Sequence, residues 1–179
     1  MRSFKRISGL QTIAHLEGAT VGKLDDFLFE LQTGAIFGWR IKTGAVFSKS
    51  GGIAVADMER IGRDVAIIRT ETAIEWAGGG KPRPVEGRAW ASAYVGMGVL
   101  TRGGRALGEV RDLYVEDAGT RVLGLLLEGN TAVVLDARTQ LGPSAVILES
   151  DSVPVALPED EGKDEWWTVL GGLMDRKAS

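Results

Sequence analysis

Gly18–Glu30 reads GATVGKLDDFLFE, and Gly104–Glu116 reads GRALGEVRDLYVE, at an offset of 86 residues. The same offset holds without a gap as far as Gly38 and Gly124. Across the matching stretches, five positions are identical and nine more keep an apolar residue in both. Self-similarity at a fixed offset is typical of a duplicated structural unit. The sequence therefore predicts two copies of one unit along a chain of 179 residues.

Apolar and polar residues alternate with a period of two within each copy, which indicates β-strands. Phe37, Trp39 and Ile41 are expected to face the core, whereas Arg40 and Lys42 are expected to face outward. The core-facing residues of the second copy are Leu123, Leu125 and Leu127. Because strand patterns dominate both copies, the predicted fold class is all-β.

Glycine makes up 25 of the 179 residues and separates many of these strands. Gln32–Gly34 and Asp117–Gly119 are predicted to be hairpin turns, because glycine adopts the positive φ that tight turns need. Met58–Ile61 and Ala137–Leu141 each follow an Asp and are predicted to be single helical turns begun by that side chain. Each copy then holds about five or six short strands, enough to close a small β-barrel.

A stretch rich in glycine and proline separates the two copies. Residues 77–84 read AGGGKPRP, a composition typical of linkers. The predicted boundaries are residues 1–73 for the first barrel, 74–90 for the linker, 91–152 for the second barrel, and 153–179 for an acidic tail with an amphipathic helix.

Cysteine is absent, and His15 is the single histidine. This composition excludes disulfides, thiolate metal sites and any site that needs two imidazoles. No metal site and no cofactor are therefore expected. The formal net charge of −3 argues against a general nucleic-acid-binding protein. No apolar run approaches the roughly 20 residues of a bilayer span and no targeting segment is visible, so a cytoplasmic location is expected.

The repeated glycines and Asp, set among apolar strand residues, resemble the PRC-barrel domain. This is the small β-barrel of the photosynthetic reaction-centre H subunit and of the C-terminal half of a ribosome-maturation factor. The residues that carry the resemblance are Gly22, Asp26, Gly38, Gly108, Asp112 and Gly124. The resemblance implies two tandem PRC-like β-barrels in a bacterial protein, which dock onto larger assemblies and have no enzyme chemistry of their own. The sequence has no counterpart to the membrane helix of the first protein or to the N-terminal domain of the second, so neither role carries over by itself.

Asp26 and Asp112 are the candidate functional side chains, because carboxylates serve as acid–base groups and metal ligands. Each occupies the same position of the repeat, without a His or Cys beside it. Asp25 forms a carboxylate pair with Asp26, but Arg111 stands at the matching position of the second copy, which argues against a two-carboxylate catalytic site. A structural role is favoured for both, as acceptors for backbone N–H groups at a bulge or turn.

The tail holds a feature outside the duplication. An acidic run at Glu159–Glu165 leads into five apolar residues with the spacing of one helix face. These residues are Trp166, Val169, Leu170, Leu173 and Met174. The pattern predicts a short C-terminal helix that packs in the groove between its own barrels or on a partner, including a second copy of the chain. The predicted interface residues are Trp166, Leu170 and Leu173.

The predicted function is a non-catalytic interaction or scaffold module that docks onto a larger protein assembly through its barrel surfaces. Two alternatives stay open: an RNA- or ribosome-associated factor resembling the ribosome-maturation barrel, and a small-molecule enzyme. A basic patch with strongly salt-dependent binding would favour the first alternative. A deep pocket with convergent polar groups would favour the second. The sequence names no protein partner, and a homo-oligomer is one of the expected arrangements.

Overall fold

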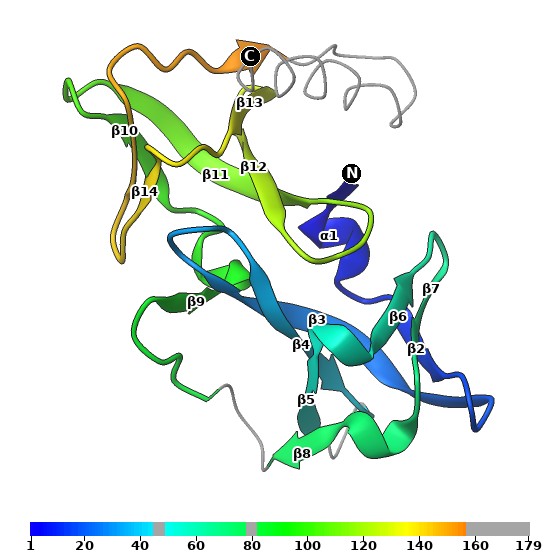
Figure 1. Ribbon diagram of the computed structural model, residues 1–179. Helices are drawn as coiled ribbons and strands as arrows, with labels where there is room; N and C mark the ends of the chain where they lie inside the picture. The colour runs from blue at the N-terminus through cyan, green and yellow to red at the C-terminus, as the bar shows by residue number, and fades with distance from the viewer. Residues whose placement is uncertain (45–48, 78–81, 157–179) are drawn as a thin grey trace.

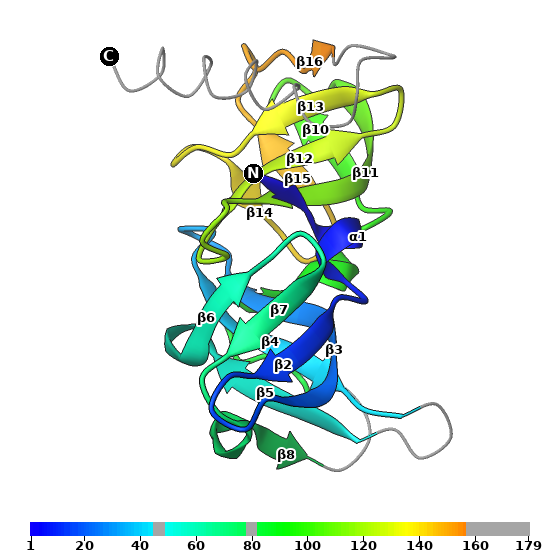
Figure 2. The same ribbon diagram turned by 90° about the vertical axis from the view of Figure 1, so that its right-hand side faces the viewer.

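The computed structural model of the chain describes residues 1–44, 49–77 and 82–156. Within these residues the strands form two eight-stranded sheets, each of which curls into one of the two lobes in Figure 1. Figure 2 shows the two lobes stacked end to end. The prediction of an all-β fold with two tandem small barrels is confirmed. The predicted C-terminal helix lies outside the described residues.

The first sheet has the strand order β6-β7-β2-β3-β4-β5-β8, with β9 paired to β3. Its neighbouring strands are antiparallel except β2 and β7, which run parallel. Its strands are β2 (Gln11–Ala14), β3 (Ala19–Glu30), β4 (Ile36–Lys42), β5 (Ser50–Ala54), β6 (Met58–Ile61), β7 (Val65–Ile68), β8 (Glu75–Ala77) and β9 (Arg88–Trp90).

The second sheet repeats this topology, with the order β14-β15-β10-β11-β12-β13-β16 and β1 paired to β11. Here β10 and β15 are the parallel pair. Its strands are β1 (Arg2–Ser3), β10 (Gly98–Thr101), β11 (Ala106–Val115), β12 (Val122–Leu127), β13 (Thr131–Val134), β14 (Gln140–Leu141), β15 (Val146–Leu148) and β16 (Val155–Ala156). The described helical segments are α1 (Phe4–Ile7) and the 3-10 turns η1 (Val55–Asp57), η2 (Glu71–Ala73) and η3 (Ala91–Ala93).

Matching residues of the two copies occupy equivalent places in the two sheets. Gly22 and Gly108 both lie beside a register shift between the first two strands of their copy. Trp39 in β4 and Leu125 in β12 both pair with the long central strand of their sheet. The constant sequence offset therefore corresponds to a repeated three-dimensional unit.

The hydrophobic core is one continuous cluster that includes residues of both sheets. Its aromatic centre lies in the first sheet, where the ring centroids of Phe27 and Trp39 are 5.0 Å apart. Phe4 of α1 contacts Phe27 edge-on at 5.4 Å, and Tyr94 contacts Phe29 at 5.4 Å. Because α1 and the segment around Tyr94 pack into a core shared by both lobes, the two barrels form one packed body.

The prediction that Phe37 faces the core is wrong, because a β-bulge interrupts the alternation in β4. Leu28 and Phe29 are successive residues of β3, and they pair with Gly38 and Ile36 of β4. Phe37 therefore has no pairing partner in β3 and is the extra residue of the bulge. Its side chain is 56% exposed, and the Arg88 guanidinium lies 3.7 Å from its ring centroid. The second copy has the same bulge at Leu123, which is half-buried.

Arg40 lies on the outer face of the first sheet, as predicted, but it is only 5% exposed. The ring of Trp90 lies over its guanidinium at 5.7 Å, and Asp25 forms an ion pair with it. Lys42 reaches the same carboxylate at 2.9 Å. Burial lowers the pKa of Arg40 from its ordinary value. The sequence pattern gave the correct face but could not indicate that β9 would cover it.

The two predicted helical turns are also wrong. Met58–Ile61 forms strand β6, which pairs with β7, and the short helix η1 ends just before it. In the second copy, the Asp136 carboxylate accepts the backbone N–H of Arg138 at 3.0 Å in a local turn. The chain then forms β14, which pairs with β15. In both places, ladder hydrogen bonds to a neighbouring strand replace the single helical turn.

The segment predicted as a linker, residues 74–90, contributes strands to the first sheet in its described part. β8 pairs with β5, and β9 pairs with β3. The first of these strands ends the first copy, whereas β9 leads directly into η3 of the second copy. This position of β9 determines how the two copies are joined.

Candidate functional site

The two copies exchange their leading segments. β1, at the start of the first copy, pairs with β11 of the second sheet, where Ser3 lies opposite Tyr114. β9, which precedes the second copy, pairs with β3 of the first sheet, where Trp90 lies opposite Leu28. Each barrel therefore receives a strand from the segment that begins the other, and α1 lies at the contact between the lobes (Figure 2).

Asp26 binds the exchanged segment on the first sheet. It follows Asp25, the extra residue of a β-bulge in β3. Its carboxylate accepts the backbone N–H of Phe27 at 2.9 Å, the backbone N–H of Ser92 at 3.1 Å and the Ser92 hydroxyl at 2.6 Å. Only 1% of Asp26 is exposed. The carboxylate thus ties the start of the second copy to the barrel of the first.

Asp112 makes the matching contacts on the second sheet. It follows the bulge residue Arg111 and accepts the backbone N–H of Leu113 at 2.8 Å. Its other donors come from the start of the chain: the Ser3 hydroxyl at 2.6 Å and the Lys5 backbone N–H at 3.1 Å. The same motif residue therefore has the same geometry in both copies, with each exchanged segment supplying two of the donors.

Replacing Asp26 by Ala should lower the free energy of unfolding by about 2–4 kcal/mol, because buried N–H and O–H donors lose their acceptor. Asp112→Ala should have a similar effect, since its three contacts match those of Asp26. Urea denaturation measures both changes. Asp64→Ala is the control, because this exposed carboxylate contacts only its chain neighbour Arg63 among the described contacts, and its loss should change stability by less than about 0.5 kcal/mol. Equal effects of all three variants would contradict the structural role.

The hairpin turns of the two sheets meet at the centre of the junction. The backbone N–H of Ile36 donates to the carbonyl of Thr120 at 2.8 Å, and the N–H of Val122 donates to the carbonyl of Gly34 at 2.9 Å. The donor and acceptor residues of one hydrogen bond are the repeat equivalents, at an offset of 86 residues, of those in the other. The junction is therefore organised about an approximate two-fold axis.

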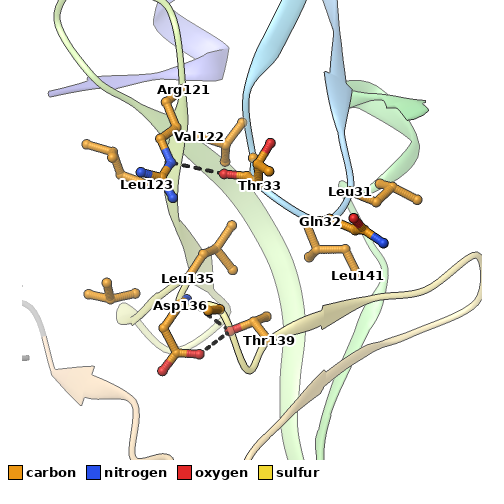
Figure 3. Close-up of a pocket in the computed structure, with 13 residues that line it drawn as sticks. Leu31, Gln32, Thr33, Arg121, Val122, Leu123, Leu135, Asp136, Thr139 and Leu141 are labelled. Carbon is orange, nitrogen blue, oxygen red and sulfur yellow. Dashed lines mark hydrogen bonds between the residues drawn. The ribbon is translucent and has the colours of Figure 1, made fainter. Parts of the chain in front are cut away.

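A groove with a volume of about 380 Å³ opens on one side of this junction (Figure 3). Its walls come from the hairpin turn of the first sheet and from β12, β13 and the segment leading into β14 of the second. The volume falls in the range of small-molecule and side-chain pockets, roughly 300–1,000 Å³. The leucines of its lining are Leu31, Leu123, Leu135 and Leu141.

Three polar side chains at the border of the groove, Arg121, Asp136 and Thr139, are held by hydrogen bonds. Arg121 donates from Nε to the carbonyl of Thr33 at 3.0 Å, which links the two sheets across the groove. Thr139 donates to the Asp136 carboxylate at 3.1 Å. Figure 3 shows both pairs at the wall of the groove. This arrangement provides an apolar surface beside the Arg121 guanidinium and the Asp136 carboxylate.

The repeated glycines and Asp of the sequence motif do not line this groove. Gly38 and Gly124 allow close strand approach, because a Cβ atom at either would lie 2.8 Å or 2.7 Å from a carbonyl oxygen of the neighbouring strand. Gly22 and Gly108 have positive φ angles of 152° and 121°. Asp26 and Asp112 lie at the exchanged segments. Trp166, Leu170 and Leu173 lie outside the described residues.

Sequence reasoning missed the groove residues, since none belongs to a chemical motif. A signal was present in the turns: at the repeat offset, residues 31–35 and 117–121 share no identical residue, so the two hairpins differ where they meet. Among the described residues, no group of three or more His, Cys, Asp or Glu side chains could hold a metal ion. His15 is exposed and contacts Glu59 at 2.9 Å, apart from the groove.

Residues 91–161 match the family model of the PRC-barrel domain. This domain is a protein-interaction module, and its family is generally non-catalytic. The strand order of the first sheet repeats that of the second, so the structure is consistent with tandem PRC-like barrels. No curated protein matches the chain. In the part of the chain that the structure describes, no helix has the length and apolar character that a membrane crossing demands.

Proposed function

We propose that this chain, with a PRC-barrel match over residues 91–161, is a non-catalytic docking module that binds a larger protein assembly through the groove between its barrels. The observation that carries the proposal is the groove itself, a space of about 380 Å³ to which both copies contribute walls. Interaction is the general role of the domain, and the groove supplies a place for it. The proposed setting is the cytoplasm.

The proposed partner presents an apolar side chain next to an acidic group. The leucines of the groove would contact the apolar side chain, and the Arg121 guanidinium at the border would pair with the carboxylate. A pocket of this volume holds only one or two side chains, so it would serve as the central anchor of a wider contact. Hydrogen bonds between the two sheets hold the junction in place and keep this pocket pre-formed, which reduces the entropy lost on binding.

The test fills the groove without altering the core. Gln32 is exposed at the hairpin turn that forms one wall, so Gln32→Trp should block the groove. Ala118 is the matching position in the other hairpin, is also exposed, and lies outside the groove. Ala118→Trp is therefore the control. Both variants and the unaltered chain serve as bait in cells of the native host, with quantitative mass spectrometry of the captured proteins.

We expect Gln32→Trp to reduce capture of a specific partner at least tenfold, whereas Ala118→Trp leaves capture unchanged. Equal capture by both variants would exclude the groove as the docking site. Recovery of RNA with a steep salt dependence would favour the RNA-associated alternative instead. Capture of the untagged chain by the tagged one would identify a homo-oligomer.

A further inference from the structure

The second sheet has an apolar outer face. Across β11, β12 and β13 the register places Tyr114, Leu126, Ala132 and Val134 on the face opposite the core residues Leu113 and Leu125. We call the first four residues the outer apolar face. Tyr114, Leu126 and Ala132 form a separate hydrophobic cluster, and they are only 4%, 8% and 1% exposed. Met1 and Val134 are the partly buried apolar side chains of the described chain that pack against it.

The first sheet shows how a matching face is covered. Trp90 of β9 lies opposite Leu28, and its ring covers Arg40, which stands at the repeat position of Leu126. In the second sheet, the residue opposite Tyr114 is Ser3. The short side chain of Ser3 donates to Asp112 and supplies no ring. The second sheet thus has an apolar Leu126 in place of Arg40, and its added strand β1 supplies Ser3 at the position where β9 supplies an indole.

The chain leaves the second sheet beside this face. Val155 of β16 pairs with Ala132, and β16 ends at Ala156. Nine residues separate Ala156 from Trp166, so the ten Cα–Cα steps between these two residues span at most about 33–36 Å. The stripe from Trp166 to Met174 is therefore within reach of every residue of the outer apolar face.

Positive charges beside the outer apolar face are complementary to the acidic sequence that precedes Trp166. Burial raises the pKa of Tyr114 to about 12, the Asp112 charge also raises it, and the Arg111 and Arg6 charges oppose this effect. Both arginines therefore lie close enough to act on the hydroxyl. The run Glu159–Glu165 carries five carboxylates, so its charge complements this border.

We propose that residues 166–174 lie on the outer apolar face of the second sheet in the same chain. Trp166 covers Leu126 as Trp90 covers Arg40, and the acidic run lies toward Arg6 and Arg111. This location differs from the two that the sequence pattern indicated, the groove between the barrels and a second chain. The proposal does not depend on the docking function, because Tyr114, Leu126 and Ala132 do not line the groove, and Val134 borders both surfaces.

The first experiment is hydrogen exchange on the full chain, read by mass spectrometry. In the unaltered chain the amides of residues 166–174 should be protected. Leu126→Arg, which introduces the residue of the first copy, should raise their exchange rates at least tenfold while amides of β4 stay unchanged. Unprotected amides in the unaltered chain, or equal protection in Leu126→Arg, would overturn the proposal.

The second experiment uses engineered cysteines, since the chain has none of its own. Val134→Cys is combined with Leu170→Cys or Leu173→Cys, and the control combines either tail cysteine with Ala54→Cys. Ala54 pairs with Gly38 as Val134 pairs with Gly124, so it holds the matching place on the first sheet. We expect an intramolecular disulfide with Val134→Cys and at least tenfold less with Ala54→Cys.

The gel pattern under non-reducing conditions distinguishes the occupants. A disulfide that joins two chains would show that a second copy covers the face. Equal disulfide formation with Ala54→Cys, or none with Val134→Cys from either tail position, would also overturn the proposal. Because these pairs leave Leu126 in place, they test the contact even if Leu126→Arg does not fold.

Discussion

A chain without Met1–Ile7 should lose more than about 5 kcal/mol of its free energy of unfolding, and its second barrel should be the part most affected. Phe4 and Ile7 are 6% and 1% exposed and belong to the shared core. Truncating one large buried apolar side chain costs about 2–5 kcal/mol. The deletion also removes β1 and two donors to Asp112, of which Ser3 lies 109 residues away in the sequence.

Guanidinium denaturation measures the total loss, and hydrogen exchange localises it to the amides of β11. Lys5→Ala is the matched control, because it keeps the backbone N–H that reaches Asp112 and changes only an exposed side chain. This variant should stay within about 0.5 kcal/mol of the unaltered chain. A deletion that costs less than about 1 kcal/mol would show that the exchanged segment does not stabilise the second sheet.

Trp39→Ala should lower the free energy of unfolding by about 3–5 kcal/mol, the range for removing a buried aromatic side chain. Trp39 is 2% exposed and packs on Phe27. Its ring also lies at the junction, since a Cβ atom added to Gly119 of the second copy would come within 3.4 Å of it. The cavity would thus open where the two lobes share their core, and both sheets would be weakened together.

Two further tryptophan variants sharpen this test. Trp39→Phe should cost less than half as much, because the indole N–H has no hydrogen-bond partner among the described residues and most of the ring volume is kept. Trp76→Ala should cost at most about 1 kcal/mol, since Trp76 is 39% exposed in β8. Fluorescence-monitored denaturation compares all three, and a Trp39→Ala loss below about 1 kcal/mol would contradict the packing.

The sequence was sufficient to predict the duplication, the all-β class and the burial of Trp39 and Ile41. Prediction from the sequence failed where contacts between distant segments override the local pattern. The bulge at Phe37 inserts one residue into β4, and an alternating pattern cannot reveal it in advance. Arg40 is buried by Trp90, a residue 50 positions further on. Met58–Ile61 became a strand because β7 offered a partner.

The alternation of apolar and polar residues could not predict the contacts between the two copies. The sequence repeat places Ser3 in the first copy and Ser92 in the second. In the structure Ser3 donates to Asp112 of the second copy, and Ser92 donates to Asp26 of the first. The groove was missed for a related reason: Leu31 and Leu135 are ordinary core-type residues, and only the junction brings them to one surface. The motif residues indicated structural positions of the barrels, but the groove depends on how the barrels meet.

The reciprocal exchange of β1 and β9 gives one polypeptide the geometry of a two-fold symmetric dimer. A protein with a single such unit would need a twin molecule to supply the donors for its Asp, so its folding would depend on protein concentration. In the present chain the two units share one backbone, and the effective concentration of one for the other is set by the connecting residues. Joining the two units in one chain thus makes intramolecular an assembly step that would be bimolecular for separate units, and each half can then carry substitutions of its own. The divergence between Arg40 and Leu126, or between Trp90 and Ser3, is the kind of asymmetry that an obligate homodimer could not acquire on one side alone.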